Sequence, residues 1–171
     1  MIRIKRGDIT KEDVAVIVNA ANEGLRGGGG VDGAVHHAAG PSVMEECRKI
    51  GRCATGEAVI TRAGKLKMLR IIHTVGPVWK GGGFGEAVLL RNAYRNSFRL
   101  ARENGLRSIA FPAISTGVYG YPKRDAAAIA LTAGREFEAD FDEIRFVCFS
   151  EEDLAVYQEV RRATEDEGSR T

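Results

Sequence analysis

The chain has 171 residues, of which 44% are hydrophobic and 28% charged, and its formal net charge is +2. This length and composition are typical of one globular domain, and no apolar run approaches the roughly 20 residues that cross a bilayer. The small net charge and the scattered Lys and Arg residues give no indication of nucleic-acid binding.

The cellular compartment is indicated by what the sequence lacks. The first residues, MIRIKRGDIT, do not contain the apolar core of a signal peptide. The three cysteines, Cys47, Cys53 and Cys148, form no CxxC pair, which favours reduced structural thiols. We therefore expect a cytoplasmic protein that does not bind membranes.

Short apolar runs alternate along the chain with segments of helical periodicity. Most of the runs are continuously apolar, as in strands that are buried on both faces of a sheet. The alternation predicts an α/β fold with a mostly parallel sheet between two layers of helices. The predicted strands are Ile2–Lys5, Ala15–Asn19, Ala58–Arg62, Ile71–Val75, Ser108–Pro112 and Ile144–Phe149.

Capping residues mark the predicted helix ends. Ser42, with Glu45 three residues later, forms a capping box at the start of one helix. Residues 86–104 carry one apolar face and are followed by Gly105 as a C-terminal stop. Pro122 starts a further helix.

The C-terminal part is predicted as a helix followed by a short tail. Ser150 with Asp153 caps this helix, which is expected to run to about Ala163. No linker or repeat divides the chain. We expect one domain over residues 1–165 and a polar, frayed tail over residues 166–171.

The most informative segment is the glycine-rich loop after the second predicted strand. Between Asn19 and Gly33 the chain reads NAANEGLRGGGGVDG, with four consecutive glycines at 27–30. Without Cβ atoms, this backbone can take positive φ and bring its N–H groups against a ligand. Such a loop between a strand and a helix suits an anion, most often a phosphate. Asn19, Asn22 and Asp32 stand around it as polar groups that can orient a sugar.

A second loop of the same character, Ser115–Gly120, follows the predicted strand Ser108–Pro112. Ligands of parallel α/β sheets bind at the carboxyl ends of the strands, so both loops are expected to line one crevice. Two phosphate-cradling loops on one small domain predict a diphosphate ligand.

Three other chemistries fit these loops poorly. Gly28, Gly30 and Gly33 satisfy G-x-G-x-x-G, but the strand ends nine residues before Gly28 and no acidic residue closes a second strand, which disfavours a nicotinamide-dependent dehydrogenase. No Gly-Lys-Ser/Thr follows either loop, which disfavours a nucleotide triphosphatase. Ser115 imitates a nucleophile elbow, but all three histidines precede it, whereas a hydrolase of that fold has its histidine after the serine. Its hydroxyl is expected to cap the loop or to bind phosphate.

The histidines do not predict a metal site. His36 and His37 are adjacent on a helix and point roughly 100° apart, so they do not easily share one ion. His73 lies in the middle of a strand among apolar residues, where a hydrogen-bonded core histidine is the default. We expect no metal.

Four candidate residues also have purely structural explanations. Asp32 fits the N-cap of the helix that follows it, and Asn22 and Asp8 fit turn positions. Phe149 fits a hydrophobic staple onto Leu154 at the start of the last helix. The residues alone leave these alternatives open.

Together, these segments resemble a macro domain, and within that family a MacroD-type one. Val18–Asn22 followed by Gly27–Gly33 resembles the first ligand loop of that subgroup almost word for word. Ile71–Pro77 and Phe111–Pro122 resemble its middle strand and its second loop. The likeness covers residues 8–157 and rests on long, specific motifs.

The resemblance implies a three-layer α/β/α sandwich with a mixed, mostly parallel central sheet. One departure is His37, where many relatives carry Arg; it lies on the helix past the loop and bears on fine tuning rather than on the family. The resemblance also implies that the protein needs neither a metal nor a dissociable cofactor.

The resemblance also implies an ADP-ribose pocket. Asp8 and the Ile9 backbone would hold the adenine, and Phe149 would stack on it. Asn22 would bind the distal ribose, and Tyr119 would pack against that sugar. The remaining implied contacts, most of them backbone N–H groups for the diphosphate, are Asn19, Gly28, Gly29, Gly30, Val31, Ser115, Thr116, Gly117 and Val118.

The implied reaction is hydrolysis of an ester on the distal ribose. The substrates would be mono-ADP-ribosylated proteins, modified on Asp or Glu, and O-acetyl-ADP-ribose. Asp32 and Asn22 would be the catalytic residues: Asp32, with a ligand phosphate oxygen, would orient and deprotonate a water while Asn22 fixes the sugar. Two alternatives stay open, a reader module that binds ADP-ribose without turnover and a phosphatase acting on ADP-ribose 1″-phosphate.

Overall fold

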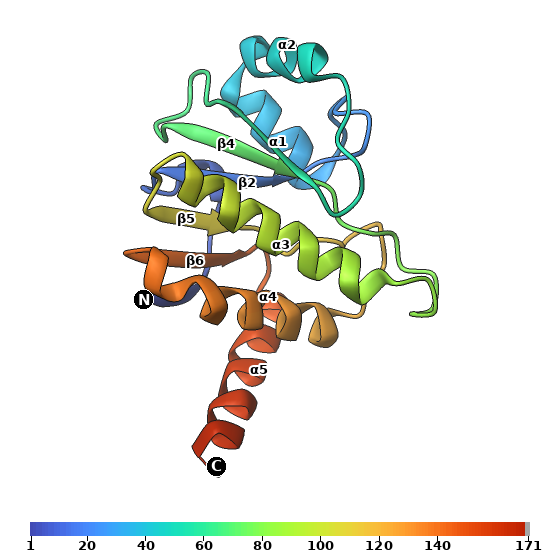
Figure 1. The fold of residues 1–171 in the computed structure, drawn as a ribbon, viewed down its shortest axis with the longest axis vertical. Helices are drawn as coiled ribbons and strands as arrows, with labels where there is room; N and C mark the ends of the chain where they lie inside the picture. Colours follow the sequence, from blue (N-terminus) through green and yellow to red (C-terminus); the bar gives the residue numbers. More distant parts are fainter. Residues whose placement is uncertain (170–171) are drawn as a thin grey trace.

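The structure, a computed structural model, describes residues 1–169 and is built around one central sheet (Figure 1). The strand order is β1-β6-β5-β2-β4-β3. The first five in this order run parallel, and β3 at the edge is antiparallel to β4. The mostly parallel sheet is therefore confirmed. Its strands are β1 (Ile2–Arg6), β2 (Val16–Ala20), β3 (Ala58–Arg62), β4 (Arg70–Thr74), β5 (Ser108–Phe111) and β6 (Glu143–Cys148).

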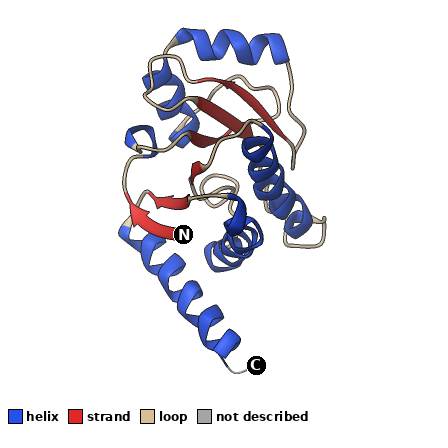
Figure 2. Cartoon of the chain, turned by 60° about the vertical axis from the view of Figure 1, so that its left-hand side comes forward, coloured by secondary structure: helices blue, strands red, loops and turns tan. Residues whose placement is uncertain are grey.

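Helices cover both faces of the sheet, so the three-layer sandwich is confirmed. One core cluster joins the strands to α3, α4 and α5, and a second joins them to α1 and α2. Figure 2 shows the strands between these two groups of helices. Across residues 1–169, none of the helices combines the length and the apolarity needed to cross a membrane. The helices are η1 (Ile9–Lys11), α1 (Gly30–Ala39), α2 (Pro41–Ile50), α3 (Glu86–Glu103), α4 (Lys123–Phe137), η2 (Glu138–Asp140) and α5 (Glu151–Ser169).

The strand β2 shows why continuous apolar runs were informative. Val16 and Val18 point into the cluster under α3 and α4, whereas Ile17 points into the cluster under α1 and α2. Successive side chains of a strand point to opposite faces, so a strand buried on both faces needs apolar residues at every position. Asn19 follows the parity of Ile17 and therefore lies on the α1 and α2 side.

Two predicted helix starts were wrong. The helix predicted to begin at Ser42 begins at Pro41, with Gly40 as its N-cap and no side-chain cap. Proline at the first helical position has its φ set for the helix, which explains why the capping box does not form. Likewise, α1 begins at Gly30 with Gly29 as its N-cap, so Asp32 lies within the first turn and is not the N-cap.

The last helix starts as predicted but ends later. Its cap is confirmed, since the Asp153 N–H donates to Ser150 Oγ at 3.1 Å. It continues beyond Ala163 to residue 169, so the predicted end was wrong. The hydroxyl of Thr164 bonds back to the Val160 carbonyl at 3.0 Å, which seats this polar residue on the helix. Of the predicted tail, residues 166–169 are helical, and residues 170–171 lie outside the described part.

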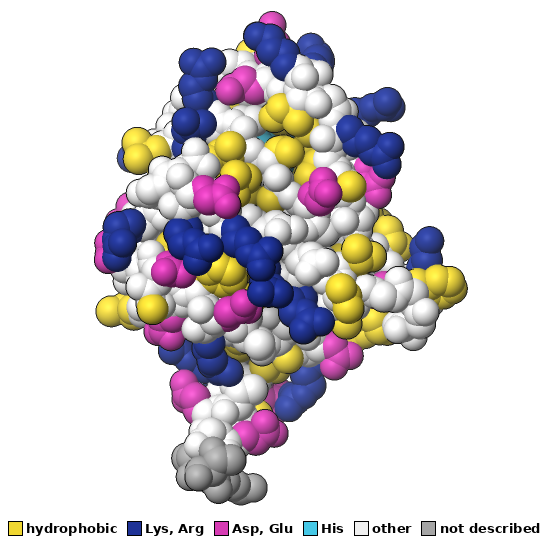
Figure 3. All heavy atoms as spheres, in the orientation of Figure 1, with side chains coloured by type: hydrophobic (Ala, Val, Ile, Leu, Met, Phe, Trp, Pro, Cys, Tyr) yellow, Lys and Arg dark blue, Asp and Glu magenta, His cyan; other side chains and the backbone are white. Residues whose placement is uncertain are grey.

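Charged side chains of both signs occur on the face of the molecule that Figure 3 shows. On the face shown in Figure 3, Lys and Arg side chains alternate with Asp and Glu rather than gathering in one basic patch.

Candidate functional site

The parallel strands all end at one edge of the sheet, and this edge carries the predicted ligand residues. Asp8 follows β1, Phe149 follows β6, the second glycine-rich loop follows β5, and the first follows β2. Because β1, β6, β5 and β2 are neighbours in this order, the four groups lie in a row. Neighbouring strands are about 4.8 Å apart, so the row extends about 14 Å.

A cavity of about 360 Å³ lies between the two glycine-rich loops. Five residues of its wall escaped the sequence analysis: Ala20, Ala21, Gly76, Ala113 and Ile114. Gly76 carried a detectable signal, since it is a glycine placed just after β4 at the same edge. Ten predicted residues line the cavity: Asn22, Gly28, Gly29, Gly30, Val31, Asp32, Ser115, Gly117, Val118 and Tyr119.

Five predicted residues lie outside the cavity wall: Asp8, Ile9, Asn19, Thr116 and Phe149. Asp8 caps η1, its Oδ1 accepting from the backbone N–H of Thr10 at 3.0 Å and from the Thr10 hydroxyl at 2.7 Å. The pKa of the Asp8 carboxyl lies below its usual value, and the hydrogen bond from the Thr10 hydroxyl is the largest cause. The turn role expected for Asp8 is thus confirmed, and Oδ2 is left for a ligand.

Phe149 stands free at the end of β6. Its side chain is 82% exposed, whereas a residue stapled onto Leu154 would be covered. The staple interpretation was therefore wrong. A large aromatic ring exposed at the ligand edge of the sheet is available to stack on a planar group.

The first turn of α1 presents backbone donors to the cavity. The N–H groups of Gly30, Val31 and Asp32 have no acceptor within a helix, and the positive end of the helix dipole lies there. Gly30 has φ +56°, and a Cβ at Gly29 or Gly30 would meet no atom within 4 Å. The space in front of the helix is therefore open to an anion.

Asn22 is folded into the turn that leads to the glycines. Its Nδ2 donates to the Gly27 carbonyl at 2.8 Å, and its Oδ1 accepts from the Arg26 N–H at 3.0 Å. The turn role is confirmed, yet Asn22 also lines the cavity. One N–H of the amide remains for a ligand.

The second loop is held by its own backbone and by the loop after β4. The Tyr121 N–H donates to the Ser115 carbonyl at 2.9 Å, and the Trp79 N–H donates to the Tyr119 carbonyl at 2.8 Å. Within the part of the chain that the structure describes, the N–H groups of residues 116–119 have no acceptor. This loop therefore offers a second set of backbone donors.

Ser115 adopts a left-handed backbone conformation, with φ +67°. Its Oγ is buried and makes no hydrogen bond within residues 1–169. Of the two roles expected for this hydroxyl, capping of the loop was therefore wrong, and phosphate binding stays a prediction. A left-handed serine is uncommon and strained, and strain of this kind often marks a ligand-binding turn.

Asp32 is the most constrained acid of the site. It is 7% exposed, and its Oδ1 accepts from Asn19 Nδ2 at 2.8 Å and lies 3.4 Å from His36 Nε2. Its other oxygen, Oδ2, lies beside Gly28 in the cavity wall: a Cβ built on Gly28 would lie 3.5 Å from Asp32 Oδ2. The same Cβ would lie 3.9 Å from Asn22 Nδ2. Asp32 Oδ2 and Asn22 Nδ2 therefore both lie beside Gly28 in the cavity wall.

Two predicted residues lie behind Asp32 in the interior. Asn19 is fully buried and reaches the cavity only through Asp32. His73 is also fully buried and hydrogen-bonded, as predicted for a core histidine. Burial is the largest cause that lowers the pKa of His73, to about 4, so its ring is neutral at neutral pH.

The three cysteines are free and buried, as expected for structural thiols. Burial raises the pKa of the Cys47 and Cys53 thiols to about 11 and that of Cys148 to about 12. These thiols are protonated at neutral pH and are therefore poor nucleophiles.

Comparison with known proteins decides the family. The Macro domain family matches residues 18–130, more than half of the chain. The chain belongs to the macro domain family. The resemblance inferred from the two loops and the middle strand is thereby confirmed.

Two relatives show how closely this macro domain follows known ones. It is 55% identical over 166 residues to a macro domain-containing protein of Chlorobaculum tepidum, covering 95% of this chain and 96% of the relative. It is 51% identical over 173 residues to a Citrobacter koseri protein named O-acetyl-ADP-ribose deacetylase, covering 97% and 98%.

Solved structures agree with this macro domain in fold. A mutant macrodomain of Oceanobacillus iheyensis with ADPR matches with a TM-score of 0.90 and 46% identity, over 95% of this chain and 92% of that chain. A Trypanosoma brucei macrodomain in complex with ADP-ribose matches with a TM-score of 0.87 and 42% identity, over 92% and 68%. The three-layer sandwich is thus the fold of its family.

Proposed function

We propose that this macro domain binds ADP-ribose and hydrolyses esters on its distal ribose. The substrates are O-acetyl-ADP-ribose and proteins that carry mono-ADP-ribose on Asp or Glu side chains. Several relatives at 51–55% identity are named O-acetyl-ADP-ribose deacetylase, and similar macrodomains have been solved with ADP-ribose.

One observation carries the proposal: the order of groups along the sheet edge matches the order of parts in ADP-ribose. Phe149 and Asp8, at the ends of β6 and β1, suit the adenine. The two sets of free backbone N–H groups, after β5 and β2, suit the diphosphate. Asn22 and Asp32 suit the distal ribose, since both line the cavity beside Gly28.

The polar groups of the site match an anionic sugar ligand in kind. Backbone N–H groups at a helix start stabilise phosphate without a cationic side chain. Among the described residues, no Lys or Arg lines the cavity, so backbone dipoles rather than cationic side chains bind the diphosphate. The exposed Phe149 ring contributes stacking of about 1–3 kcal/mol.

The chemistry follows from the pair Asn22 and Asp32. Asn22 holds the ribose with its remaining N–H, and Asp32 Oδ2, together with a ligand phosphate oxygen, orients a water and accepts its proton. The ester is replaced by one carboxylic acid and one ribose hydroxyl, so the water is consumed and the proton returns to the products. An acceleration of 10⁶-fold corresponds to about 8 kcal/mol, much of which positioning of the water can supply.

The other potential nucleophiles, the Ser115 hydroxyl and the three thiols, lack a means of activation. Ser115 Oγ has no hydrogen-bond partner within the described residues, so no base activates it. The thiols are buried outside the cavity and protonated. Direct attack by water is therefore the supported route.

The test begins with binding and proceeds to turnover. Calorimetric titration with ADP-ribose, AMP and NAD is expected to show the tightest binding for ADP-ribose. Acetate release from O-acetyl-ADP-ribose, and ADP-ribose release from a protein modified on glutamate, are then measured for the wild type, Asn22→Ala and Asp32→Ala. We expect release by the wild type and strong suppression in both variants.

Two results would replace the proposal. Tight binding without release at high enzyme concentration would identify a reader module. Release of phosphate from ADP-ribose 1″-phosphate, without ester hydrolysis, would identify a phosphatase.

A further inference from the structure

A continuous chain of buried hydrogen bonds runs from the sheet to Asp32. Asn19 Nδ2 lies 2.8 Å from Asp32 Oδ1 and 3.1 Å from His73 Nδ1. On the other side of the ring, His73 Nε2 lies 2.9 Å from Thr61 Oγ1. Asn19 and His73 are fully buried and Thr61 is 1% exposed.

Donors and acceptors can be assigned to these bonds from the Thr61 hydroxyl, and Cys47 Sγ, 3.9 Å from His73 Nε2, is a weaker second acceptor for Nε2–H. The Thr61 hydroxyl donates its hydrogen to the Arg62 carbonyl at 2.9 Å, so its oxygen accepts from His73 Nε2–H. His73 Nδ1 is then unprotonated and accepts from Asn19. The Asn19 amide therefore turns its nitrogen, rather than its oxygen, toward the Asp32 carboxylate.

The sheet itself places these side chains in line. Asn19 on β2 is the direct neighbour of His73 on β4 in the parallel register. Thr61 on β3 pairs with Ile71, two residues before His73, on the same face. That face lies under α1 and α2, and α1 brings Asp32 down onto Asn19.

We propose that Asn19, His73 and Thr61 are positioning residues that orient the Asp32 carboxylate for ester hydrolysis. An asparagine amide can rotate by half a turn at little cost, which would set its oxygen against the Asp32 oxygen. Here the Nε2–H tautomer of His73, held by Thr61, prevents that rotation. Oδ1 of Asp32 is thereby held inward and Oδ2 toward the cavity. This inference rests on the proposed function, in which Asp32 acts on the water.

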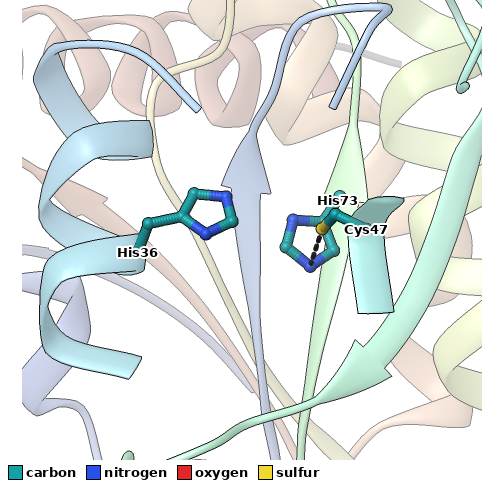
Figure 4. A group of neighbouring side chains, drawn as sticks. All are labelled: His36, Cys47 and His73. Atoms are coloured by element: carbon teal, nitrogen blue, oxygen red, sulfur yellow. Dashed lines mark hydrogen bonds between the residues drawn. The ribbon is translucent and has the colours of Figure 1, made fainter. Parts of the chain in front are cut away.

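A metal ion is the competing occupant of the same place. In the part of the chain that the structure describes, donor atoms of His36, Cys47 and His73 all lie within 4.8 Å of one another. Figure 4 shows the side chain of His36 extending toward that of His73, with ring centroids 5.9 Å apart, and Cys47 beside His73, its Sγ 3.9 Å from Nε2. Zinc would require Zn–N near 2.1 Å and Zn–S near 2.3 Å. Both nitrogens of His73 already have hydrogen-bond partners, so binding a metal would break the hydrogen bond to Asn19 or the one to Thr61.

The first experiment changes Thr61, which does not line the cavity. Thr61→Val keeps the shape and removes the oxygen, whereas Thr61→Ser keeps the oxygen. With O-acetyl-ADP-ribose as substrate, we expect kcat to fall roughly 10-fold in Thr61→Val, in keeping with the cost of a misplaced catalytic group. The dissociation constant of ADP-ribose should stay within about twofold, and Thr61→Ser should restore kcat. Unchanged kcat in a folded Thr61→Val protein would overturn the proposal.

The second experiment observes the histidine directly. In protein labelled with ¹⁵N-histidine, the His73 ring is expected to show the neutral Nε2–H tautomer between pH 6 and 8. The signal is assigned by its loss in His73→Asn, with His37→Gln as the matched control for an exposed histidine. We expect Thr61→Val to shift this signal toward the other tautomer.

The spectrum also separates the remaining outcomes. An Nδ1–H tautomer in the wild type would overturn the proposed row of hydrogen bonds from Thr61 through His73 and Asn19 to Asp32. Addition of zinc that removes the Nε2–H signal at a stoichiometric amount would also overturn it, in favour of a metal site. A wild type that binds ADP-ribose without turnover would overturn the proposed function. The tautomer of His73 would still show whether the hydrogen bonds that link Thr61, His73, Asn19 and Asp32 form as proposed.

Discussion

Gly76 and Ser115 meet in the wall of the cavity, and the contact requires that residue 76 has no side chain. A Cβ at Gly76 would lie 2.1 Å from Ser115 Oγ and 2.5 Å from Cγ2 of Ile114. Ser115 is at the same time the residue that turns the second loop, with φ +67°. The path of this loop is therefore set by a glycine that follows a different strand.

Gly76→Ala is expected to displace the second loop and to weaken ADP-ribose binding by about 10-fold or more. Overpacking of this kind costs about 1–3 kcal/mol when the loop keeps its wild-type path. Because the ligand requires that path, each 1.4 kcal/mol of this cost lowers the affinity by a factor of ten. Ser115→Gly, which relieves the left-handed strain and removes Oγ, should retain near wild-type affinity. Calorimetry on both folded variants checks the prediction, and wild-type affinity in Gly76→Ala would show that the loop does not depend on this contact.

Gly29→Glu should abolish ADP-ribose binding without unfolding the protein. A Cβ at Gly29 meets no atom within 4 Å, and an acidic side chain suits a helix N-terminus. In the bound state, however, the carboxylate would occupy the phosphate position and repel the ligand. Gly83→Glu, also in open space but away from the cavity, is the control. Equal affinity in the two variants would remove the start of α1 from the binding site.

Phe149→Ala tests the adenine end of the site. We expect the affinity for both ADP-ribose and AMP to fall by a factor that corresponds to about 1–3 kcal/mol. Because the ring is 82% exposed, the melting temperature should not change. Turnover of saturating substrate should be less affected, since the ring is remote from Asn22 and Asp32. A lower melting temperature with unchanged AMP affinity would return Phe149 to a structural role.

The strands and the two loops could be predicted because their signals are local. Continuous apolar runs located all six strands to within one residue at each end. Glycines without side chains marked the places where backbone must approach a ligand. The helix start near Pro41 was misplaced because the backbone restriction of proline prevailed over the capping box of Ser42. The start of α1 was misplaced because Gly29, rather than Asp32, is its N-cap.

The parts of the site that could not be predicted depend on contacts between distant strands. Asn19 and His73 are 54 residues apart, and their bond exists because β2 and β4 pair in one register. The same holds for Gly76 and Ser115, which meet only after β4 and β5 are both in place beside β2. Periodicity and spacing carry no information on such pairs, so the interior support of Asp32 was not visible in the sequence.

Acid should destabilise the protein through His73. Its pKa is lowered from 6.5 to about 4 in the folded state, first by burial. Between these values the unfolded chain binds a proton that the folded chain does not, so the free energy of unfolding falls as the pH is lowered. The loss is about 2 kcal/mol at pH 5 and about 3 kcal/mol near pH 4.

Urea unfolding at pH 7.5 and pH 5 measures this loss. His73→Asn removes the titrating ring but keeps an amide acceptor for Asn19, so the free energy of unfolding should change about 2 kcal/mol less between the two pH values than in the wild type. His37→Gln, at an exposed position, should behave as the wild type. If the free energy of unfolding of His73→Asn depends on pH as strongly as that of the wild type, the buried ring is not the group that couples folding to acid. The assignment of Nδ1 as an unprotonated hydrogen-bond acceptor for Asn19 would then lose its support.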